Sequence, residues 1–75
     1  METYKINFMW DKEVSVWIAT SDDIKGLVLE HSSFDALLER VRVAVPELLE
    51  MEKIFPNNLF LDYSISCSER ISLNR

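Results

Sequence analysis

The side chains best suited to chemistry in this 75-residue chain are one histidine, one cysteine and two adjacent aspartates. His31 could act as a general base, and Cys67 as a nucleophile, if each faced a suitable partner in a pocket. Asp22 and Asp23 could bind Mg²⁺ or share a proton. Each possibility depends on the structural element that carries the residue.

The local context favours structural roles for all four residues. His31 directly precedes a predicted helix, so we expect an exposed loop histidine. Cys67 falls in the apolar phase of a predicted strand, where cysteine behaves as a small hydrophobic residue. Asp22 and Asp23 are neighbours in a turn-rich segment and lack a spaced third acid, which favours turn formation over metal binding. We predict a protein that is not an enzyme, with no catalytic residue, metal ion or cofactor.

The charge balance points to proteins as partners. The chain has 13 acidic and 8 basic residues and a net charge of −5. Nucleic-acid binding needs a basic surface, which this composition argues against. An acidic chain suits a basic protein partner, because charge complementarity speeds encounter. No apolar stretch is as long as a membrane span and no signal-peptide pattern is present, so we expect a cytoplasmic protein without membrane contact.

The length predicts one domain, residues 1–75, that is short of internal stabilisation. A core of this size supplies roughly 3–5 kcal/mol, and small domains usually add disulfides, metals or association. A single cysteine excludes an internal disulfide, and soft metal ligands are too few for a closed zinc site. We therefore expect a homo-oligomer or a permanent protein partner.

Three strands are predicted within residues 3–30. Alternating apolar residues over 4–10 and 14–20 indicate two half-buried strands, and 27–30 indicates a short third. A three-residue loop, 11–13, would pair Trp10 with Val14 and place the alternating apolar residues of both strands on one face. A five-residue loop is the alternative, because residue 13 is not the glycine that three-residue loops favour.

A helix and a fourth strand follow. Apolar residues at spacings of three and four predict a helix over 32–51, capped by Ser32 or Ser33 and kinked near Pro46. The alternative is a second short helix that begins at Pro46. Renewed alternation predicts a strand over 59–67. The predicted fold is α+β, in the order β-β-β-α-β, with an antiparallel sheet and one helix packed on one face.

The candidate interaction residues are Met9, Trp17 and Val43. The predicted register places Met9 and Trp17 as diagonal neighbours on the outer face of the hairpin, and Val43 lies on the outward side of the helix. Large apolar side chains on a solvent face can mark an interface, and tryptophan is common in binding hot spots. The alternative is that scattered apolar surface residues have no role. Edge strands offer a second route to partners.

The chain also resembles the HicB-like antitoxin superfamily, and is most similar to its short stand-alone bacterial branch of unknown function. The resemblance covers residues 4–51. Its motifs are Tyr4-Lys5-Ile6-Asn7-Phe8, Trp10-Asp11, Val16-Trp17-Ile18-Ala19-Thr20-Ser21, Asp23-Ile24-Lys25-Gly26-Leu27 and Val45-Pro46-Glu47-Leu48-Leu49-Glu50.

The resemblance implies a partial ribonuclease-H-like fold that lacks the catalytic acids. HicB proteins self-associate, neutralise a small basic toxin that cleaves messenger RNA, and often bind their operator through a C-terminal helical domain. The turn at 21–26 lacks the prolines common in that family, and we expect no DNA-binding domain after residue 51. Two hypotheses result: an antitoxin-like module that binds a basic RNA-cleaving toxin, or a homo-oligomeric domain with no toxin partner.

Overall fold

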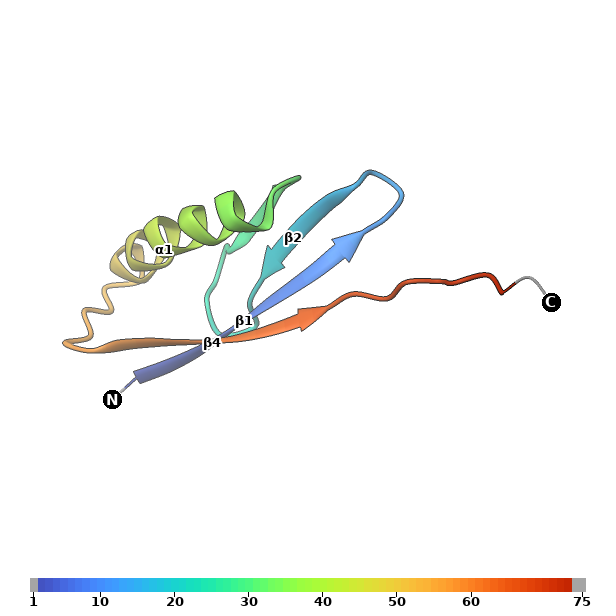
Figure 1. Cartoon of the computed structure of the whole chain (residues 1–75). Helices are drawn as coiled ribbons and strands as arrows, with labels where there is room; N and C mark the ends of the chain where they lie inside the picture. Colours follow the sequence, from blue (N-terminus) through green and yellow to red (C-terminus); the bar gives the residue numbers. More distant parts are fainter. Residues whose placement is uncertain (1, 74–75) are drawn as a thin grey trace.

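The computed structural model describes residues 2–73, in which four strands form one open sheet with a single helix on one face (Figure 1). The elements are β1 (Glu2–Asp11), β2 (Val16–Thr20), β3 (Val28–His31), α1 (Phe34–Met51) and β4 (Leu59–Ser66). The strands lie in the order β3-β2-β1-β4. The predicted α+β class and β-β-β-α-β order are therefore confirmed.

The sheet is mixed, because β4 runs parallel to β1 while the other neighbours are antiparallel. Since β1 and β3 are both antiparallel to β2, they run in the same direction. The 18 residues of α1 then carry the chain back by about 27 Å, at 1.5 Å per residue. The next strand consequently starts at the same end of the sheet as β1. The prediction of a fully antiparallel sheet is wrong at this one pairing.

The predicted hairpin register is also wrong. Asp11 pairs with Val16 and Trp10 with Trp17, which leaves a four-residue loop, 12–15, between the strands. The loop is stabilised by a hydrogen bond from the Glu13 amide to the Asp11 carboxylate, at 3.0 Å. Ser15 adopts a φ of 55°, in the left-handed region. The shift exchanges the two faces of β2.

Trp17 and Ala19 therefore face α1, and Ile18 lies on the opposite face beside Met9. The Trp17 ring lies 5.3 Å from the Trp10 ring and 5.1 Å from the Phe34 ring, measured between centroids. Ala19 is completely buried in the core beneath the helix.

The helix packs its apolar stripe over β2 and β3. Its buried residues are Leu37, Val41, Val45 and Leu49. Ser33 is the N-cap and accepts a hydrogen bond from the Ala36 amide, which confirms one of the two predicted caps. One helix continues through Pro46, so the two-helix alternative is wrong. Pro46 and Arg42 are both exposed, so water can satisfy the carbonyl that Pro46 leaves unpaired.

The connection from β2 to β3 contributes more to the core than its turn-rich sequence indicates. Ile24 and Leu27 are each only 2% exposed and complete the core beside β1. Gly26, between them, has a φ of 86°, a conformation that glycine adopts without steric cost. The predicted turn is therefore also a core segment.

The corrected register can be tested by comparing substitutions on the two faces of the hairpin. We expect Trp17→Ala to lower the free energy of unfolding by about 2–3 kcal/mol, because it removes ring contacts beneath the helix. Met9→Ala, on the opposite face, should change it by less than about 1 kcal/mol. Urea unfolding followed by far-ultraviolet circular dichroism measures both. Equal losses would contradict this register.

Candidate functional site

The three residues predicted to mediate interactions lie apart. Met9 is 53% exposed on the sheet face away from α1. Trp17 is half-buried on the face toward α1, so its predicted place beside Met9 on the outer face is wrong. Val43 is exposed on the helix, as predicted. Substituting Trp17 would disturb the core and would be a poor test of binding.

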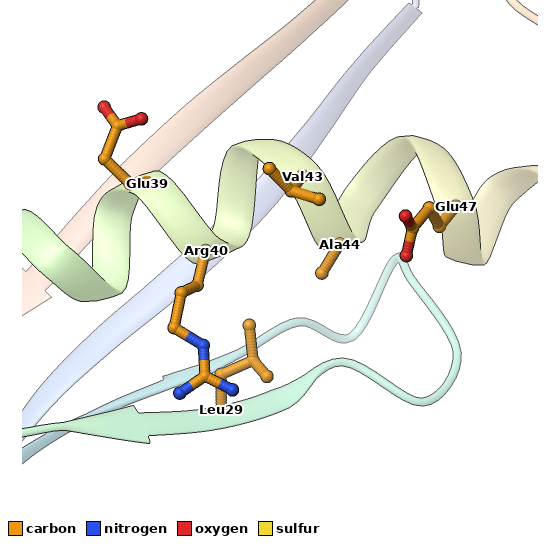
Figure 2. A pocket seen from close by; sticks show the side chains of 6 residues that line it. All are labelled: Leu29, Glu39, Arg40, Val43, Ala44 and Glu47. Atoms are coloured by element: carbon orange, nitrogen blue, oxygen red, sulfur yellow. The ribbon is translucent and has the colours of Figure 1, made fainter.

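Val43 lines a shallow groove of about 410 Å³ between α1 and the edge strand β3 (Figure 2). The apolar part of its lining is Leu29, Val43 and Ala44, and the charged part is Glu39, Arg40 and Glu47. Figure 2 shows the Arg40 side chain extending from the helix toward Leu29 on β3. The mixed charges do not favour any one class of charged ligand.

The residues with chemical potential have structural surroundings. His31 lies in β3 rather than in a loop, and its Nδ1 accepts a hydrogen bond from the Ser33 amide at 2.9 Å. Cys67 follows β4 and is exposed, so its predicted place within the strand is wrong. Within residues 2–73, His, Cys, Asp and Glu side chains do not gather in groups of three or more that could hold a metal ion.

Asp23 joins the loop after β2 to β1. Its carboxylate accepts a hydrogen bond from the Lys5 amide at 2.7 Å. The Ser21 hydroxyl donates to the Lys5 carbonyl at 2.6 Å and accepts from the amides of Asp23 and Ile24. These hydrogen bonds take the place of the backbone hydrogen bonds between β1 and β2 beyond the end of β2. Asp23 therefore holds the backbone of β1 in place rather than a ligand.

An apolar surface that is partly exposed on β4 was missed by the sequence analysis. The inner residues of β4, on the same side of the sheet as α1, are Leu59, Leu61, Tyr63 and Ile65; we call them the β4 face. The helix lies on that same face but over β2 and β3, toward the edge of the sheet opposite β4 (Figure 1). Tyr63 is consequently 42% exposed and Ile65 57% exposed, although the Tyr63 ring packs edge-on against Phe8.

The β4 face continues into an apolar groove at the end of α1. This groove, of about 250 Å³, is lined by Pro46, Leu49, Glu50, Ile54, Phe55, Pro56 and Leu59. Phe55 is 70% exposed there.

Tyr4 pairs with Leu61 in the neighbouring strand. The pKa of Tyr4 is raised, first by the hydrogen bond that its hydroxyl donates to the Glu2 carboxylate and then by desolvation and by the charges of Glu2 and Asp23.

An extended segment follows β4 and projects from the body of the molecule (Figure 1). We call residues 67–73 the arm. Ile71 and Leu73 are 71% and 72% exposed. They share the odd-numbered phase of the apolar residues of β4, and the charged residue Glu69 interrupts that pattern within the arm. The free edge of β4, its apolar face and the arm form one surface.

Comparisons with known proteins place the chain in a family. Residues 3–73 match the family model described as Domain of unknown function (DUF1902), and the chain belongs to this family. It is similar to the crystal structure of the hypothetical protein TTHA1013 from the extremely thermophilic bacterium Thermus thermophilus. The identity is 34% and the TM-score 0.80, over 93% of this chain and 100% of that one. No curated protein matches the chain.

The helix of the structure does not have the composition of a membrane span. Among the described residues, α1 is the one helix, and it is not apolar enough over its length to cross a bilayer.

The different roles of Asp22 and Asp23 in the fold can be tested by substituting each one. We expect Asp23→Ala to lower the free energy of unfolding by about 1–2 kcal/mol, because the Lys5 amide loses its charged acceptor. Asp22→Ala is the matched control and should stay within about 0.5 kcal/mol of the wild type. Urea denaturation of the three proteins makes the comparison, and a larger loss for Asp22→Ala would overturn the assignment.

Proposed function

We propose that this member of the DUF1902 family is a protein-binding module without catalytic chemistry of its own, and that a protein partner docks on the β4 face. One observation carries the proposal: β4 is an edge strand whose apolar side lies outside the cover of α1. Edge strands present unpaired backbone groups to another chain. An apolar face beside such an edge adds side-chain contacts to main-chain hydrogen bonds.

The charge of the chain supports a basic partner in the cytoplasm. A net charge of −5 favours encounter with a positively charged protein. The resemblance to HicB-like antitoxins suggests what such a partner does: it is a small basic toxin that cleaves RNA, and binding neutralises it. In this form of the proposal, the module acts by covering the toxin rather than by reacting with it.

The second candidate is a homo-oligomeric domain with a structural or regulatory role and no toxin partner. The arm favours it, because the chain then carries both an extended apolar segment and a surface that could receive one.

The proposal is tested by producing the chain together with the product of the adjacent reading frame. We expect a small basic protein that co-elutes in size-exclusion chromatography and loses its RNA cleavage in the complex. Tyr63→Lys should weaken the complex by about tenfold or more, because it puts a charge into an apolar contact. Calorimetric titration of the purified partners measures the affinity.

Phe60→Lys is the matched control, since Phe60 lies on the same strand with similar exposure, 47%, but on the opposite face. Equal effects of the two substitutions would contradict docking on the β4 face. An adjacent frame whose product is not basic, or does not bind, would remove the toxin-like form of the proposal. Circular dichroism verifies that both variants are folded.

A further inference from the structure

The arm makes the molecule much longer than its body. The radius of gyration is 14.9 Å and the longest dimension is 58 Å, whereas a compact domain of this length has a radius of gyration of about 11 Å. Holding a segment extended costs roughly 1–2 kcal/mol of conformational entropy per residue. Contacts within the chain offset little of this entropic cost, because Ile71 and Leu73 remain exposed. Contacts outside the chain could supply it.

We propose that the arm and β4 pair antiparallel with the arm and β4 of a second copy, around a two-fold axis that passes beside Ser66. The two four-stranded sheets then join edge to edge. This inference rests on the proposed function, because it names the protein that docks on the β4 face. A second copy fits because the donor segment and the acceptor edge are consecutive in one chain, which makes the surface self-complementary.

Symmetry alone brings the apolar residues of the two strands together. A two-fold axis perpendicular to the sheet leaves each side chain on its own face. Directly opposed residues in an antiparallel pair also share a face. Odd-numbered residues, which face the α1 side in β4, can therefore oppose only odd-numbered residues of the second copy. Ile71 and Leu73 consequently lie on the same face as β4's apolar residues in every allowed register, and so does the charged residue Glu69.

The charges select one register among those allowed. Asp62 lies on the outer side of β4, and Arg70 has the same parity in the arm. Ser66 is midway between them, so an axis there places Asp62 opposite Arg70 of the second copy, twice per dimer. A shift of two residues would place Arg70 opposite Ser64 or Phe60 instead. Opposite charges directly across an antiparallel pair are favourable, and like charges are unfavourable.

The same register places a residue of the arm opposite each residue of the β4 face. Cys67 would lie opposite Ile65 of the second copy, and the charged residue Glu69 would lie opposite Tyr63. Ile71 would lie opposite Leu61 of the second copy, and Leu73 opposite Leu59. Because Leu59 lines the groove beside Ile54 and Phe55, Leu73 would reach the mouth of that groove. The arm therefore supplies an occupant for both the β4 face and the groove at the end of α1.

The first test measures the mass of the pure chain in reducing buffer by light scattering and sedimentation equilibrium. We expect a dimer, and we expect Arg70→Asp to raise its dissociation constant by about tenfold, because it creates two like-charge pairs. Asp62→Arg should act in the same direction. The double variant, Asp62→Arg with Arg70→Asp, should recover most of the affinity. Single losses without recovery in the double variant would overturn the register.

The second test locates the axis by cross-linking. In a Cys67→Ser background, Ser66→Cys places two cysteines directly opposite each other, at a separation that a disulfide can span. Mild oxidation should give a covalent dimer on a non-reducing gel. Ser64→Cys is the matched control on the same face, and its two copies would be too far apart to join. Cross-linking of the control alone would overturn the proposed axis.

The outcomes separate this inference from the proposed function. A chain that is monomeric at hundreds of micromolar, yet binds the product of the adjacent frame through Tyr63, would overturn the dimer and leave the proposed function intact. A chain that neither dimerises nor binds that product would overturn both. A dimer whose mass is unaffected by Arg70→Asp and by the paired substitutions Ile71→Ser and Leu73→Ser would overturn the role of the arm.

Discussion

The width of one helix limits what this fold can bury. A helix with its side chains is about 10 Å across, and neighbouring strands lie about 4.8 Å apart, so one helix covers about two strands. The sheet has four. The burial of Ala19 and the ring contact of Trp17 with Phe34 hold α1 over β2 and β3. The exposed half of the β4 face follows from that placement, and so does the shortage of core that makes association favourable in a small domain.

Local signals in the sequence predicted the elements well, because the interactions that define them are local. The N-cap Ser33 lies at the start of an apolar stripe of period 3.6, and that stripe keeps its phase through Pro46. The hairpin register was less accessible. Both phases of residues 14–20 are apolar, with Val16 and Ile18 on one and Trp17 and Ala19 on the other. The choice between them depends on Phe34, a contact from the following helix, and on the left-handed conformation of Ser15.

The proposed interaction surface was harder to predict than the fold, because it depends on strand order rather than on any one segment of the sequence. The alternation of β4 indicates one buried face, but it does not reveal that the strand lies at an edge and runs parallel to β1. Once β4 is at the edge beyond the helix, Tyr63 and Ile65 become surface residues without any change in their pattern. Met9 and Val43 are exposed where they were expected, yet they lie on opposite sides of the sheet from each other. The return of the odd-numbered apolar phase at Ile71 and Leu73, after the charged residue Glu69, was the signal in the sequence that the surface extends past β4.

The net charge of −5 acts in opposite directions on the two classes of partner. Two copies of an acidic chain repel one another, so their association must rely on short-range contacts: the apolar residues of the β4 face and the opposed pair Asp62 and Arg70. Added salt screens the long-range repulsion over about 10 Å at 0.1 M and should favour the second copy. A basic partner is attracted by the same charge, so added salt should slow its encounter. Both proposed partners would use the β4 face, since it combines an open strand edge with uncovered apolar side chains. A basic protein that binds there must therefore compete with the arm of a second copy, and ionic strength would shift the balance between them.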